Sequence, residues 1–84
     1  MSIKVVVANL EYKDHIVSVS AIWDTQHQYQ FTPFVEIRAR VASSKLLNTI
    51  LTHHQAFTTD QKAIEFGFGL GREWVDERLL GISL

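Results

Sequence analysis

Four histidines are the first candidates for chemistry in this chain of 84 residues. His53 and His54 are adjacent, whereas His15 and His27 lie far from them in the sequence. Imidazole is a common metal ligand, but neighbouring residues of a strand point to opposite faces, and no HExxH or Cys/His spacing is present. We therefore predict surface histidines, with no bound metal and no cofactor.

Three alternating glycines, Gly67, Gly69 and Gly71, precede Arg72 in a pattern that suggests a phosphate-binding loop. The run lacks the GxGxxG spacing and a terminal Gly-Lys-Ser/Thr. It also falls inside a predicted helix, whereas phosphate loops lie at a strand-to-helix turn, where backbone N–H groups point outward. Close packing of the helix on a sheet is the better explanation of these glycines.

Carboxylates gather late in the chain, at Glu65, Glu73, Asp76 and Glu77. Their spacing is typical of a solvated helix face. The serines and threonines have no neighbouring base in a recognisable nucleophile elbow, and the chain has no cysteine. The sequence therefore predicts a protein that is not an enzyme.

Composition limits the class of protein. The length predicts one domain over residues 1–84, and the formal charge of −1 gives no electrostatic argument for nucleic acid or an anionic membrane. No apolar run approaches the ~18 residues that a membrane span needs, and the first residues lack a signal-peptide cleavage site. We expect a small cytoplasmic protein that does not enter a membrane.

Residues 57–80 are predicted to form one helix on which the fold depends. Thr58, in a capping box with Gln61, and Thr59 are alternative N-caps. Arg78 in the last turn and Gly81 just beyond it predict the end of the helix. One face repeats at steps of three and four residues: Ala63, Ile64, Gly67, Phe68, Leu70, Gly71, Trp74 and Val75.

A strand is the alternative for part of this stretch, because Ile64, Phe66, Phe68 and Leu70 also alternate with glycine or glutamate. The helix is favoured because the caps are in place and residues 71–80 do not alternate. Each internal glycine costs about 1 kcal/mol relative to alanine, which close contact with a sheet would offset.

The preceding residues predict strands. Residues 3–10, 16–23 and 30–42 are rich in apolar residues, mostly in alternation, with a turn at Lys13-Asp14 and with Pro33 tolerated at an edge or bulge. Residues 43–55 fit either a helix capped by Ser43 or Ser44, with Leu46, Leu47, Ile50 and Leu51 on one face, or a fourth strand over residues 47–54. The strand is favoured. The fold class is therefore α+β: an antiparallel sheet of three or four strands covered by one C-terminal helix.

Four patches resemble a family of small bacterial proteins that has no established activity: residues 12–16 (YKDHI), 34–40 (FVEIRAR), 57–59 (FTT) and 71–76 (GREWVD). Family members read YKG, an alternating strand with basic outer residues, F-x-T-x-E-E-A and GR-x-x-ID. Asp14 stands in place of the turn glycine, and Gln61-Lys62 in place of the acidic pair. The resemblance implies a β-β-β-β-α order, a strand within 47–54 and Thr59 as the cap, and it implies no activity.

The outer face of the third strand is a candidate surface, because Phe34, Glu36, Arg38 and Arg40 alternate along it with Ser18 and Ser20 nearby. Aromatic and arginine side chains on an exposed sheet bind bases in some RNA-binding domains. A nucleic-acid-associated accessory or regulatory role is therefore the alternative function. The simpler interpretation is a solvated face with extended arginines.

One helix is too small to cover all the apolar side chains. Those left over are Ile16, Ile22, Phe34, Phe66, Leu79, Leu80, Ile82 and Leu84. Exposed apolar patches on small domains mark partner surfaces, and open sheet edges pair with other strands. We expect a small interaction module, a homodimer or a partner of another protein, with a possible interaction surface at Phe34, Arg38, Arg40, Phe66 and Leu80.

Overall fold

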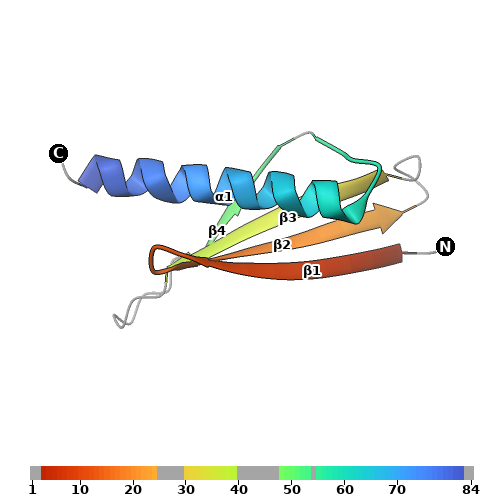
Figure 1. The fold of residues 1–84 in the computed structure, drawn as a ribbon, viewed down its shortest axis with the longest axis horizontal. Coiled ribbons are helices and arrows are strands. Elements are labelled where there is room, and N and C mark those ends of the chain that lie inside the picture. Colours follow the sequence, from red (N-terminus) through yellow and green to blue (C-terminus); the bar gives the residue numbers. More distant parts are fainter. Residues whose placement is uncertain (1–2, 25–29, 40–47, 54, 83–84) are drawn as a thin grey trace.

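The computed structural model describes residues 3–24, 30–39, 48–53 and 55–82. It contains β1 (Ile3–Tyr12), β2 (His15–Asp24), β3 (Gln30–Ala39), β4 (Asn48–Leu51) and α1 (Asp60–Ile82). The strands form one antiparallel sheet in the order β1-β2-β3-β4, and α1 lies across one face of it (Figure 1). The predicted two-layer β-β-β-β-α fold is confirmed.

The first hairpin turns on two residues, Lys13 and Asp14, whose φ angles are 46° and 61°. Positive φ at both central residues is characteristic of a type I′ turn, whose twist matches that of the flanking strands. Aspartate tolerates this left-handed conformation better than most residues. Tyr12 and His15 close the ladder on either side of the turn, so a tight β1–β2 pairing runs along both strands.

Alternation places one set of side chains from β2 and β3 under the helix. Val17 pairs with Ile37 and Val19 pairs with Val35, so these four side chains share a face. They are 0–1% exposed and form the centre of the core with Val75 of α1. The predicted apolar faces of both strands are therefore confirmed as the inner face of the sheet.

β4 is a strand, as favoured, but it is shorter than the predicted range of residues 47–54. Its Asn48–Leu51 segment pairs with Val35–Arg38 of β3. Pro33 lies outside this paired part of β3, so its nitrogen has no partner strand in β4. His53 Nε2 donates a hydrogen bond to the Pro33 carbonyl. Pro33 therefore lies at a gap in the pairing, between the Val35–Leu51 pair and the Phe31–Phe57 bridge, where a missing backbone N–H is tolerated. The predicted residues 40–42 of the third strand lie outside the described residues.

The helix begins as one of the two predicted alternatives requires. Thr59 Oγ1 accepts a hydrogen bond of 3.1 Å from the Lys62 backbone N–H, so Thr59 is the N-cap, and Asp60 lies in the first turn. The predicted end is wrong. α1 continues to Ile82, and Gly81 lies within it without the positive φ that a glycine C-cap adopts.

Gly67 and Gly71 lie where the helix meets the sheet. A Cβ atom added to Gly67 would be 2.6 Å and 2.7 Å from the two methyl groups of Val19. One added to Gly71 would be 2.9 Å from Val17 Cγ2 and closer still to Val17 Cγ1. The predicted close approach of helix and sheet is confirmed, and the absent side chains are what permit it.

Candidate functional site

The outer face of the sheet, opposite α1, carries the exposed apolar side chains of the strands. Val7, Ser20 and Phe34 form one row across β1, β2 and β3, and Val5 and Ile22 belong to the next row. Val7 is 59% exposed and Phe34 43% exposed. We call the set that shares this face the outer patch: Ile3, Val5, Val7, Ile22, Phe34 and Ile50.

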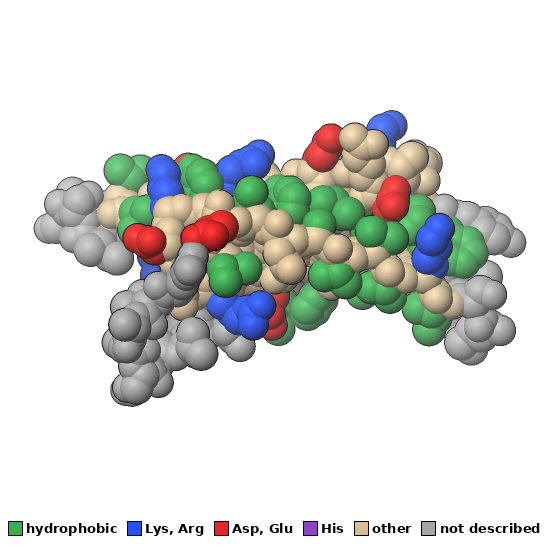
Figure 2. All heavy atoms as spheres, turned by 60° about the horizontal axis from the view of Figure 1, so that its bottom comes forward, with side chains coloured by type: hydrophobic (Ala, Val, Ile, Leu, Met, Phe, Trp, Pro, Cys, Tyr) green, Lys and Arg blue, Asp and Glu red, His purple; other side chains and the backbone are tan. Residues whose placement is uncertain are grey.

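The outer patch is unusual for an antiparallel sheet, in which a face without a covering layer is normally polar. Ile3 and Ile50, at its margins, are 63% and 53% exposed. Figure 2, which turns the underside of Figure 1 toward the viewer, shows hydrophobic side chains along much of the molecule, with charged groups between and around them. No described element lies over these strands on this face.

The same face becomes polar toward the β1–β2 turn. Ser18 Oγ donates a hydrogen bond of 2.7 Å to Asn9 Oδ1 across the β1–β2 ladder. Arg38 Nε lies 3.7 Å from Glu36 Oε1 on β3. The outer face therefore has an apolar end and a polar end of mixed charge, and the Arg38 guanidinium already has an acidic neighbour.

The four described residues of the predicted interaction surface, Phe34, Arg38, Phe66 and Leu80, do not lie on one face of the molecule. Phe34 and Arg38 share the outer face, about 13 Å apart along β3 at ~3.3 Å per residue. Arg40 lies outside the described residues. Leu80, 68% exposed, is near the end of α1, in the opposite layer.

Phe66, predicted to lack a cover, is half-buried, and this expectation is wrong. Its ring centroid lies 5.2 Å from that of His53 and 5.1 Å from that of Phe57. Phe57 in turn pairs with Phe31 of β3 through two backbone hydrogen bonds of 2.6 Å and 2.8 Å. The segment before the helix is held against β3 and covers the Phe66 ring, an arrangement that helical spacing alone does not reveal.

His15 is buried, which contradicts the prediction of a surface side chain, and His53 is half-buried. His15 is only 7% exposed; its Nδ1 donates a hydrogen bond of 2.7 Å to the Lys13 carbonyl, and its ring meets Trp74 edge-on at 6.4 Å. It faces inward because it lies on the same face as Val17, two residues along β2. His27 and His54 lie outside the described residues. Within the described part, no three metal-ligating side chains are grouped.

Asp76 is a structural contact and not part of a purely solvated helix face, which corrects the prediction. Tyr12 OH donates one hydrogen bond that the two carboxylate oxygens of Asp76 share, at 2.9 Å and 3.0 Å, and Lys13 Nζ lies 2.7 Å from Asp76 Oδ1. The Lys13 ammonium, followed by the Tyr12 hydroxyl, lowers the pKa of Asp76 below its ordinary value. These contacts of Tyr12 and Lys13 with Asp76 connect the first hairpin to α1.

Among the described residues no helix is long and apolar enough to cross a membrane. No family model matches the chain, and neither a curated protein nor a solved structure matches it. The resemblance to the family of small bacterial proteins therefore stays a prediction, and the geometry of the chain itself carries the functional argument.

Proposed function

We propose that this protein is a non-catalytic interaction module that forms a homodimer through the outer patch. The observation that carries the proposal is the exposure of Val5, Val7, Phe34 and Ile50 on a sheet face that no described element covers. Burial of apolar surface is the main driving force of most protein association. A second copy of the chain offers an equally uncovered face.

The size of the face fits a small dimer. β1, β2 and β3 have 10 residues each and β4 has 4. At ~3.3 Å per residue and ~4.8 Å between strands, the sheet covers roughly 500 Å² in projection, and protruding side chains increase the accessible area. A stable interface buries about 600–1,000 Å² on each partner, so the face is large enough only if most of it takes part.

The distribution of polarity is compatible with two-fold symmetry. In a symmetric dimer the same patch packs against itself, and two sheets stack face to face about 10 Å apart. An axis parallel to the strands brings the apolar end of one sheet over the apolar end of the other. The ends that carry Glu36 and Arg38 then also meet, and their opposite charges allow pairing across the axis.

The contacts of the titratable side chains support a non-catalytic role. Tyr12, Lys13 and Asp76 contact one another where the hairpin meets the helix. His15 and His53 each hydrogen-bond to a backbone carbonyl and contact an aromatic ring. These contacts give each of the five side chains a role in holding elements of the fold together.

The mass of the protein in solution tests the proposal. Sedimentation equilibrium is expected to give the mass of two chains at roughly 100 µM protein, since small interfaces have affinities in the micromolar range. Phe34→Lys and Val7→Lys place a charge in the outer patch, and each is expected to give the mass of one chain. Leu80→Lys is the matched control, because the same change on the exposed end of α1 should leave the dimer intact.

Three results would contradict the proposal. If the wild-type protein is monomeric at this concentration, the homodimer is excluded. A dimer that survives both Phe34→Lys and Val7→Lys uses another surface, such as the open edge of β1. Salt-dependent binding of labelled RNA that is lost on changing Arg38 and Arg40 to alanine would instead support the nucleic-acid alternative.

A further inference from the structure

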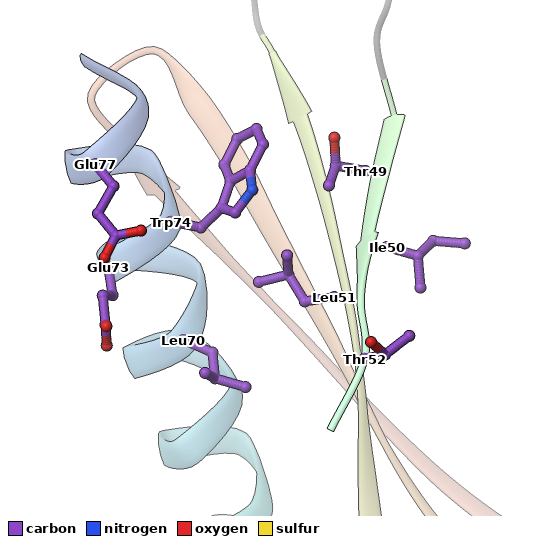
Figure 3. A pocket seen from close by; sticks show the side chains of 8 residues that line it. All are labelled: Thr49, Ile50, Leu51, Thr52, Leu70, Glu73, Trp74 and Glu77. Carbon is purple, nitrogen blue, oxygen red and sulfur yellow. The ribbon is translucent and has the colours of Figure 1, made fainter. Parts of the chain in front are cut away.

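A groove separates the C-terminal half of α1 from β4, on the face of the sheet opposite the outer patch (Figure 3). Its volume is about 430 Å³, within the range of ligand-binding pockets. It exists because Gly71 fixes the helix over Val17 of β2. β4 lies two strands away from β2, about 10 Å to the side, so the helix does not cover it.

β4 is the outermost strand on this side of the sheet and pairs with β3 along one edge. No other described strand pairs with its second edge, so the backbone donors and acceptors along that edge have no strand partner among the described residues. An extended peptide that joins such an edge gains main-chain hydrogen bonds, and its alternate side chains enter neighbouring pockets. The groove beside β4 is placed to receive those side chains.

The floor of the groove is apolar and held in place. Leu70 and Trp74 point from α1 toward β4, and Leu51 points back from β4, as Figure 3 shows. The Trp74 ring is fixed by edge-on contact with His15 at 6.4 Å and by the Arg78 guanidinium at 5.3 Å from its centroid. A partly exposed tryptophan with a fixed orientation is a frequent anchor in protein interfaces.

The helical rim of the groove is negatively charged. Glu73 and Glu77 are one turn apart, both exposed, and neither forms an ion pair with another described residue. Like charges at this spacing weaken an isolated helix slightly, and a cation placed between them relieves the repulsion. Their spacing of ~6 Å along the helix is close to the ~6.8 Å between alternate residues of a strand.

We propose that this groove binds an extended segment of another protein that adds to the edge of β4. Alternate residues of the segment carry two lysines or arginines, which pair with Glu73 and Glu77, and an aliphatic side chain, which contacts Leu70 and Trp74. This inference goes beyond the homodimer and does not depend on it, because Leu51 and the groove residues of α1 lie on the face opposite the outer patch. Ile50 belongs to the outer patch and also lines the groove.

A fluorescein-labelled peptide, Lys-Thr-Lys-Thr-Ile-Thr with blocked ends, is the probe. Its fluorescence anisotropy is expected to rise on titration with the full chain, and less so at high salt. Glu73→Gln with Glu77→Gln should weaken binding about ten-fold, since each exposed ion pair contributes up to a factor of about five. Glu65→Gln removes one charge from the exposed N-terminal half of α1 and should leave binding unchanged.

Two further measurements separate strand addition from charge attraction alone. A peptide with N-methyl groups on the backbone nitrogens that face β4 keeps its charges but is expected not to bind. On addition of the unmodified peptide, the NMR signals of the Trp74 indole and the Thr49–Thr52 amides should shift. Both measurements are made with Phe34→Lys as well, so that failure of the dimer proposal leaves this one testable.

Several outcomes would overturn the inference. One is no binding of the peptide up to roughly 1 mM, the weak limit of specific association. Equal binding of Glu-Thr-Glu-Thr-Ile-Thr would show that the acidic rim has no part. A change of oligomeric mass in the Glu73→Gln, Glu77→Gln protein would show that a second copy occupies the groove.

Discussion

Alanine substitution at the three glycines of α1 gives the sharpest test of how the helix contacts the sheet. A Cβ atom at Gly69 would have no heavy atom within 4 Å, whereas one at Gly67 would lie within 2.7 Å of both Val19 methyl groups and 3.1 Å from Val35 Cγ2. Ordinary contacts between carbon atoms are about 3.5–4.0 Å. The three changes therefore add the same methyl group to one helix in very different surroundings.

The magnitudes follow from these contacts. Gly69→Ala should stabilise the protein by about 1 kcal/mol, the difference in helix propensity. At Gly67 the same gain in helix propensity is opposed by overpacking against the sheet, which costs about 1–3 kcal/mol. Rotation of Val19 about χ1 does not relieve the contact, because both of its methyl groups are too close and a β-branched side chain has few alternatives.

We therefore expect Gly67→Ala and Gly71→Ala each to destabilise the fold by about 1 kcal/mol. Each of these variants should then be roughly 2 kcal/mol less stable than Gly69→Ala. For a domain of this size the corresponding thermal midpoints are separated by roughly 8–16 °C. Urea unfolding followed by circular dichroism measures the free energies. All variants must be compared at one protein concentration, because dimerisation would add to the apparent stability.

The same glycine substitution in a Val19→Ala protein tests whether contact with Val19 is the cause of the destabilisation. Val19→Ala removes the two methyl groups that the new Cβ atom would meet, so Gly67→Ala should become neutral or stabilising in that protein. If Gly67→Ala and Gly71→Ala stabilise the wild-type protein as much as Gly69→Ala does, the glycines are not what brings helix and sheet together.

Three other predictions concern single contacts. Thr59→Ala removes the N-cap and should cost about 1 kcal/mol in urea unfolding, whereas Thr58→Ala should change stability by less than about 0.5 kcal/mol. Lys13 and Tyr12 lower the pKa of Asp76, so their contacts stabilise the fold above pH 3.8, and this stabilisation is lost as the pH falls through the folded-state pKa. In Asp76→Asn the free energy of unfolding should therefore depend less on pH in the acid range. His53 hydrogen-bonds through Nε2 to a carbonyl and accepts the Gln55 N–H at Nδ1. In ¹⁵N NMR the neutral imidazole should therefore be the Nε2–H tautomer, and an Nδ1–H signal would contradict this.

Local pattern was enough to predict most of the architecture. Val17 and Val19 alternate with serines, which predicts a strand with one buried face, and the glycines at helical spacing predict the close approach to that face. The residues alone do not decide between Thr58 and Thr59 as the N-cap, because both have the required hydroxyl. Only the hydrogen bond to Lys62 decides it.

The errors share a physical cause, which is contact between residues far apart in the chain. The sequence predicts His15 at the surface because a histidine before a strand has no local reason to be buried, and its partner Trp74 is contributed by the helix. Asp76 has the spacing of a solvated residue, yet it binds Tyr12 from the first hairpin. The sequence does not predict the groove beside β4, because helical spacing assigns Trp74 to the core and does not show which strands the helix leaves uncovered.

The order of the layers along the chain has a consequence for biosynthesis. The segment that shields Val17, Val19 and Val35 is α1, whose residues leave the ribosome after all four strands. Until then a nascent meander presents two bare apolar faces, a state prone to aggregation and to capture by chaperones. Mutations that slow docking of the last segment should therefore lower the yield of protein in cells more than their effect on equilibrium stability would suggest.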